Sequence, residues 1–159
     1  MSKKLVAYFS ITGNTRKAAE EISKLLNCDL YEIKAKIPYK EEDLQWGPCR
    51  SKREAADRTL RPELADKNAQ IHKYDTIIIG FPVWSGLAPS IILTFLEAYD
   101  FRKKKIVIWG TTWKSLMGNI MSEIRNIAKE SIVIEGVIFD GAHRNTYNYK
   151  KFVSNILNK

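Results

Sequence analysis

Short apolar runs alternate along the chain with stripes of apolar residues at helical spacing, and this alternation restricts the fold more than any other feature. Two runs, TIIIG at 76–80 and IVIWG at 106–110, are apolar throughout, which is typical of strands buried on both faces of a parallel sheet. The expected strands are 4–9, 29–34, 76–80, 105–110 and 132–139. Helical stripes around 18–26, 91–99, 120–128 and 149–157 lie between or after them, and each is expected to face the core. The pattern predicts an α/β fold built on a parallel sheet.

The length of 159 residues predicts one domain, spanning 1–159, that is large enough to bury a proper core. The segment 35–74 interrupts the alternation with several prolines and many charges, and a short helix is expected at 51–58. So long a connection is unusual in a compact domain. It is interpreted either as a surface excursion that covers the sheet edge or as a functional insertion.

The net charge is +8, from 26 Lys and Arg against 18 Asp and Glu. Because these charges are spread along the chain, a basic surface is favoured over a nucleic-acid site, and no nucleic-acid partner is expected. The two cysteines, Cys28 and Cys49, match no metal spacing, so no metal is expected. Neither a secretory signal nor a membrane span is visible, and a reduced, cytoplasmic setting is the expectation.

The segment YFSITGNT at 8–15 follows the first expected strand and leads into the first expected helix. Such a turn offers backbone N–H groups, the positive end of a helix dipole and hydroxyl groups, which together suit a phosphate. Three hydroxyl side chains and three backbone donors are the candidate ligands: Ser10, Thr12 and Thr15, with Ile11, Gly13 and Asn14. Helix capping by Asn14 or Thr15 is the alternative, but it explains one residue rather than three hydroxyls.

Two later loops belong to the same edge of a doubly wound sheet, where ligands bind. The loop after the third strand supplies candidate cofactor contacts from Pro82, Val83, Trp84, Ser85 and Gly86. Its indole is placed to face a planar ligand, with packing in the core as the alternative. The loop after the fourth strand adds Thr111, Thr112, Trp113 and Lys114. The backbone amides of this loop would contact the polar edge of a ring, and the Trp113 indole would cover a face of it. The Lys114 ammonium group would stabilise a negative charge on the ring.

These loops resemble those of flavodoxins. The pattern Ser/Thr-x-Thr-Gly-x-Thr at 10–15 is similar to the loop that binds the FMN phosphate in that family. PVWSG at 82–86, APSIILTFLEAYDF at 88–101 and RPEL at 61–64 resemble a bacterial branch with a long connection between strands 2 and 3. The resemblance covers nearly the whole chain. It implies FMN as cofactor and a flavodoxin-like, three-layer, doubly wound fold with a five-stranded parallel sheet in the order 2-1-3-4-5, the order that defines flavodoxins.

The chain departs from this family pattern in two loops. Where the family often has Thr-Ser-Gly-Gly-Ser-Gly, residues 111–116 read TTWKSL, so a backbone that needs positive φ there could not be kept without strain. Ser85 stands where the branch often has a second Trp, and Trp113 is a candidate replacement for its stacking surface. The peptide between Ser85 and Gly86 resembles the one whose carbonyl turns toward flavin N5 when N5 gains a proton.

The resemblance favours a cytoplasmic FMN protein that transfers electrons between redox proteins and needs no catalytic acid or base. The positive charge implies an acidic redox partner. One alternative is an FMN-dependent NAD(P)H or quinone reductase, in which His143 would assist proton delivery. Another is a non-enzymatic interaction module with a degenerate flavin site, which the altered third loop motivates. Redox potentials, substrates and oligomeric state are left open.

Overall fold

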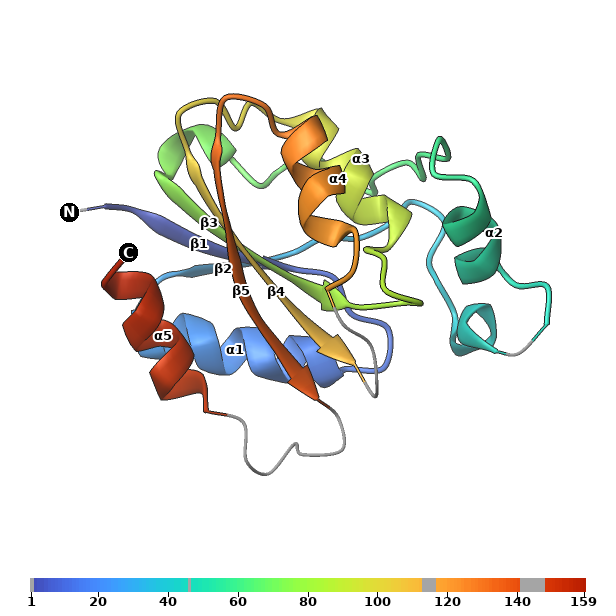
Figure 1. Ribbon diagram of the computed structural model, residues 1–159, viewed down its shortest axis with the longest axis horizontal. Helices are drawn as coiled ribbons and strands as arrows, with labels where there is room; N and C mark the ends of the chain where they lie inside the picture. The colour runs from blue at the N-terminus through green and yellow to red at the C-terminus, as the bar shows by residue number, and fades with distance from the viewer. Residues whose placement is uncertain (1, 46, 113–116, 141–147) are drawn as a thin grey trace.

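One parallel sheet forms the middle layer of the molecule, in the order β2-β1-β3-β4-β5 (Figure 1). The computed structural model describes residues 2–45, 47–112, 117–140 and 148–159. The strands are β1 (Lys4–Tyr8), β2 (Asp29–Glu32), β3 (Thr76–Pro82), β4 (Lys105–Thr112) and β5 (Ile132–Asp140). This order and the parallel pairing confirm the expected fold class.

Two helices cover each face of the sheet (Figure 1). They are α1 (Asn14–Leu26) and α5 (Tyr149–Leu157) on one face, and α3 (Ser90–Ala98) and α4 (Ile120–Ile127) on the other. Each face has its own apolar cluster, and the central strands contribute alternate residues to the two clusters. Six of the seven residues of β3 are buried, which explains why its sequence is continuously apolar.

Strand ends differ from the expected bounds for reasons that lie in the neighbouring strands. β2 stops at Glu32 rather than at residue 34 because its only partner, β1, ends at Tyr8. The amide of Ile33 still donates to the carbonyl of Tyr8, at 2.7 Å. β3 runs two residues beyond residue 80 because it pairs with β4 as far as Pro82. β4 runs two residues beyond residue 110 because Thr111 pairs with β3 and Thr112 pairs with Asp140 of β5.

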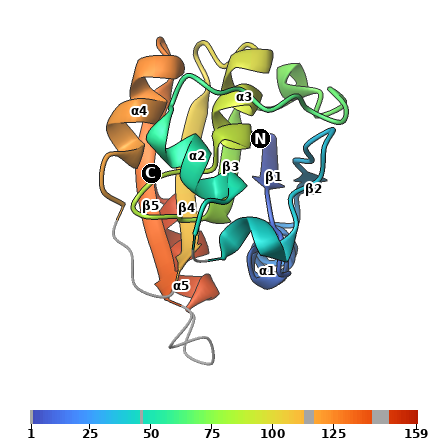
Figure 2. The same ribbon diagram turned by 90° about the vertical axis from the view of Figure 1, so that its right-hand side faces the viewer.

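The long segment between β2 and β3 folds as a compact excursion with one short helix, α2 (Arg50–Ala56). It also contains two 3-10 turns, η1 (Glu41–Leu44) and η2 (Ile71–Lys73). The segment leaves and returns through a short antiparallel pairing in which Ala35 faces Leu64. α2 lies off the sheet, at the side to which β3 points (Figures 1 and 2). The excursion is therefore close to the edge where ligands bind in doubly wound folds.

Within the described ranges, no helix is long and apolar enough to cross a membrane. No group of three or more His, Cys, Asp or Glu side chains is placed to hold a metal ion in this part of the chain either.

The two cysteines should differ in reactivity toward alkylating reagents. Burial raises the pKa of the Cys28 thiol to about 11, whereas the Ser51 hydroxyl lowers that of Cys49. Thiolate is the nucleophile, so at pH 8 Cys49 is expected to react with iodoacetamide well before Cys28. Peptide mass mapping during the reaction checks this order, and equal rates for the two cysteines would contradict it.

Candidate functional site

A hydrogen bond from Gly13 to Ser10 and the left-handed conformation of Gly13 shape the turn between β1 and α1. The hydroxyl of Ser10 accepts a hydrogen bond from the amide of Gly13, at 3.1 Å. Gly13 is the N-cap of α1 with a φ of 93°, so Gly13 takes the position expected for Asn14 or Thr15. No side chain caps this end of α1 among the described residues, and its first turn contains no acidic residue. The helix N-terminus therefore keeps its positive end available for an anion.

Two hydroxyls link this turn to the end of β4. Thr15 and Thr111 lie with their Oγ1 atoms 2.7 Å apart, and both side chains are buried. In such a pair one hydroxyl donates to the other, so one O–H remains to donate elsewhere. The sequence interpretation placed Thr111 with the ring-edge loop, whereas the structure brings it to the α1 end.

Trp109 of β4 has a buried donor without a partner among the described residues. Trp109 is fully buried two residues before Thr111, on the same face of β4, and its Nε1–H has no acceptor among the described residues. The indole lies against Gly80, where an added Cβ would come within 2.1 Å of its Cε2 atom. Buried polar groups normally have partners, so this orphan marks a place where a ligand or a water would complete the structure.

The loop after β3 contains a tight turn at the expected cofactor residues. Trp84 and Leu87 exchange two backbone hydrogen bonds of 3.0 Å. Ser85 and Gly86 between them have φ values of 52° and 74°, as in a type I′ turn. The carbonyl of Gly86 faces Gly118, where an added Cβ would lie 2.8 Å from that oxygen. The loops after β3 and β4 are therefore in contact at Gly86 and Gly118.

The Trp84 side chain belongs to an aromatic cluster with Phe9 and Tyr39. Its ring centroid lies 5.9 Å from that of Phe9 and 5.7 Å from that of Tyr39. Trp84 remains partly exposed. It is thus both a packing residue and a surface available at the sheet edge, so the two interpretations of this indole are compatible.

Tyr39 belongs to the long excursion, where the ion pair between Arg50 and Glu54 holds its ring in place. Tyr39 donates to Glu54, at 2.8 Å, and the guanidinium carbon of Arg50 lies 3.6 Å from the ring centroid of Tyr39. Glu54 is only 4% exposed and accepts from Arg50 Nε at 3.1 Å. Burial and the Glu54 carboxylate raise the pKa of Tyr39, so the phenol stays protonated and keeps donating.

Arg58 fastens the same excursion to the loop after β3 and to α4. Its guanidinium donates to the carbonyl of Ala88 at 2.8 Å and pairs with Glu123 at 2.6 Å. The excursion is therefore a structural wall of the candidate site. Sequence reasoning missed Tyr39, Arg50 and Arg58, because nothing in the spacing of an irregular segment shows which of its residues turn inward.

Replacing Arg58 with methionine is expected to lower the free energy of unfolding by about 2 kcal/mol, because Glu123 and the Ala88 carbonyl lose a charge-assisted donor. Chemical denaturation checks the value. The matched control is Arg61→Met, which removes a more exposed pair with Glu97 and should cost less than about 1 kcal/mol. Equal losses in the two variants would contradict the anchoring role.

The structure brings the candidate residues of the three loops to one edge of the sheet. Residues 10–15 form the turn into α1 and its first two residues, residues 82–86 are the last residue of β3 and the loop after it, and Thr111 and Thr112 end β4. Trp113 and Lys114, expected to contact a ring, lie outside the described residues, as does His143. The fold and its edge thus define a doubly wound α/β protein in which the N-terminus of α1, without a side-chain cap among the described residues, lies at the point where strand order reverses.

The chain belongs to the flavodoxin family, whose sequence profile matches residues 3–156. A protein of Bacteroides eggerthii is 35% identical with a TM-score of 0.88, covering 99% of this chain and 97% of its own. One from Bacteroides uniformis is 36% identical with a TM-score of 0.85, covering 99% of both. A flavoprotein of Lactobacillus acidophilus, solved in complex with FMN, is 24% identical with a TM-score of 0.67, covering 92% and 99%. No curated protein matches the chain.

Proposed function

We propose that the protein binds FMN at this edge and transfers electrons between redox proteins. The observation that carries the proposal is the uncapped N-terminus of α1, with Ser10, Thr12 and the Thr15–Thr111 pair around it. The FMN complex of the Lactobacillus acidophilus flavoprotein, which has the same fold, supports it.

The donor set fits a phosphate dianion. Hydroxyl and amide donors surround the turn at 10–15, and the first turn of α1 brings no carboxylate to repel an anion. In this proposal Thr111 donates to Thr15, which leaves the Thr15 hydroxyl free to donate to a phosphate oxygen. Thr111 is then a positioning residue.

The ring of the cofactor would lie toward the loops after β3 and β4. Trp84 offers a partly exposed indole there, and the type I′ turn at 85–86 presents backbone amide and carbonyl groups. When bound, FMN supplies the redox chemistry, accepting and releasing electrons. The protein would position the cofactor. Tyr39 packs against Trp84 and stays protonated, because it donates its hydroxyl to Glu54.

The partners in this proposal are acidic redox proteins. The net charge of +8 favours electrostatic steering toward negative surfaces, which accelerates encounter at low ionic strength. The cytoplasm is the proposed location, because both cysteines are unpaired.

The visible absorption spectrum of the purified protein is the first test, followed by titration of the stripped protein with FMN and with riboflavin. Flavin bands, quenched fluorescence on titration and tighter binding of FMN than of riboflavin are expected, because only FMN has the phosphate. A protein without flavin, whose titration shows no quenching, would overturn the proposal. Oxidation of NAD(P)H with a quinone acceptor would instead identify the reductase alternative.

A further inference from the structure

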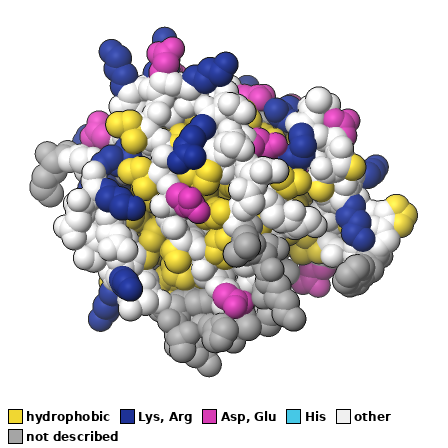
Figure 3. All heavy atoms as spheres, in the orientation of Figure 1, with side chains coloured by type: hydrophobic (Ala, Val, Ile, Leu, Met, Phe, Trp, Pro, Cys, Tyr) yellow, Lys and Arg dark blue, Asp and Glu magenta, His cyan; other side chains and the backbone are white. Residues whose placement is uncertain are grey.

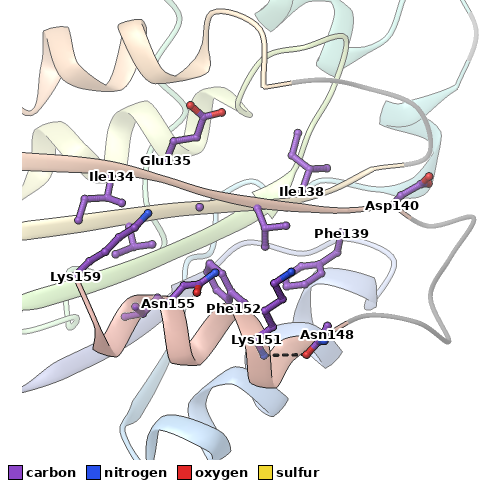
Figure 4. Close-up of a pocket in the computed structure, with 14 residues that line it drawn as sticks. Ile134, Glu135, Ile138, Phe139, Asp140, Asn148, Lys151, Phe152, Asn155 and Lys159 are labelled. Atoms are coloured by element: carbon purple, nitrogen blue, oxygen red, sulfur yellow. Dashed lines mark hydrogen bonds between the residues drawn. The ribbon is translucent and has the colours of Figure 1, made fainter.

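A cavity lies away from the candidate flavin site, between β5 and α5 (Figure 4). It has a volume of about 390 Å³, within the range of small-molecule sites. Its lining comes from β5, from α5 with the residues that flank it, and from Val107 of β4. None of the candidate flavin residues lines it.

The strand that lines the cavity carries a bulge. Ile108 of β4 faces Glu135, but Gly110 faces Ile138, so β5 has one residue more than β4 in this stretch. Gly136 lies in the bulge, where an added Cβ would lie 2.4 Å from the carbonyl oxygen of Ile108 and 2.9 Å from Phe152 Cε2. The glycine therefore lets Phe152 of α5 pack closely on β5 at this point, and the cavity lies beside that contact.

The inner wall of the cavity is aromatic and aliphatic. Phe139 and Phe152 meet at 90° with centroids 5.7 Å apart, and both are 5% exposed. Ile134 and Ile156 extend the same wall. The exposed Val137 of β5 lies beside it, and hydrophobic side chains gather on this face of the molecule (Figure 3). Such a wall suits a flat apolar body.

Two ammonium groups stand at the mouth of the cavity. Lys151 and Lys159 flank Asn155 at a spacing of four residues, and Figure 4 shows both lysine side chains reaching toward β5, Lys151 from α5 and Lys159 from just beyond its end. Within the described ranges neither ammonium has a carboxylate within 4.0 Å. Of the two acidic residues of the lining, Glu135 points to the other side of β5 and Asp140 lies at the far end (Figure 4).

We propose that this cavity is a second binding site, for a small apolar organic anion with a flat ring, of the aromatic carboxylate or sulfonate class. The ring would lie against Phe139 and Phe152, and the anionic group would lie between Lys151 and Lys159. Charge complementarity selects an anion over a neutral or cationic ligand. The site is separate from the candidate flavin site, because the two share no residue.

The probe is anilinonaphthalene sulfonate, an aromatic anion, and N-phenylnaphthylamine is its neutral counterpart. Both are titrated into the full chain by calorimetry, without and with excess FMN, so that the candidate flavin site is tested separately. The variants are Lys151→Gln with Lys159→Gln, and Asn155→Trp, which places a large ring at the mouth from an exposed position. The matched control is Lys129→Gln with Lys150→Gln, which removes the same charge elsewhere on the surface.

The expected result is binding of one sulfonate probe per chain, unaffected by FMN. The Lys151 and Lys159 variant should bind the sulfonate probe about tenfold more weakly, while its affinity for the neutral probe changes little. The control variant should bind both probes with nearly unchanged affinity. Asn155→Trp should remove binding of both probes. Absence of stoichiometric binding, equal loss in the lysine control, or competition by FMN would each overturn the second site.

Discussion

Replacing Thr12 and Thr15 together with alanine is expected to weaken FMN binding by about a hundredfold or more. Each charge-assisted hydrogen bond to a phosphate contributes roughly 1.5–3 kcal/mol, and the double variant removes two such donors. Thr12 is exposed at the turn, whereas Thr15 is buried against Thr111, so the two hydroxyls act from different sides. Fluorescence titration with FMN measures the loss.

Riboflavin separates the phosphate contribution from a general loss of structure. The double variant should bind riboflavin as the unmodified protein does, because the ring contacts remain. Thr94→Ala, which removes a hydroxyl bonded within α3, is the matched control and should leave both affinities unchanged. An unchanged FMN affinity in the double variant would refute the phosphate assignment.

Replacing Gly80 with alanine is expected to lower the free energy of unfolding by about 3 kcal/mol or more, because the new methyl group needs space that Trp109 occupies. An added Cβ would lie 2.0 Å from Trp109 Cζ2, so the indole must move. Trp109 is fully buried against Phe139 and has no room to shift cheaply. Chemical denaturation measures the effect.

A double variant identifies the cause. Trp109→Leu removes the colliding ring, so Gly80→Ala should cost much less in that background, and the two changes should not add. Gly110→Ala is the milder comparison, since the nearest atom to its added Cβ is a methyl of Val83 at 2.8 Å. Wild-type stability in the single Gly80→Ala variant would show that the sheet accommodates the methyl group.

The architecture could be predicted because apolar patterning and chain order carry it directly. The continuous apolar run of β3 reports burial on both faces, and the turn after β1 reports where an anion would bind. The end of β2 could not be predicted in the same way. It depends on where β1 stops, which is a property of the pair rather than of either sequence.

The candidate site could be predicted only in part, for a related reason. The sequence could nominate Ser10, Thr12 and Thr15 as phosphate ligands, because hydroxyl groups around a glycine form a pattern within a few residues. The pairing of Thr15 with Thr111 joins residues 96 positions apart, and no local pattern specifies it.

The sequence by itself determined the alternation of strands and helices, the parallel sheet and the position of the turn between β1 and α1, because each depends on side chains that are close along the chain. Only the tertiary structure decided that Tyr39 and Arg58 lie beside the candidate site and that Trp109 is buried with no acceptor among the described residues. It also decided that β5 carries a bulge at Gly136 and that a cavity lies between β5 and α5. These features arise where distant segments meet, and their energies depend on distances that folding sets.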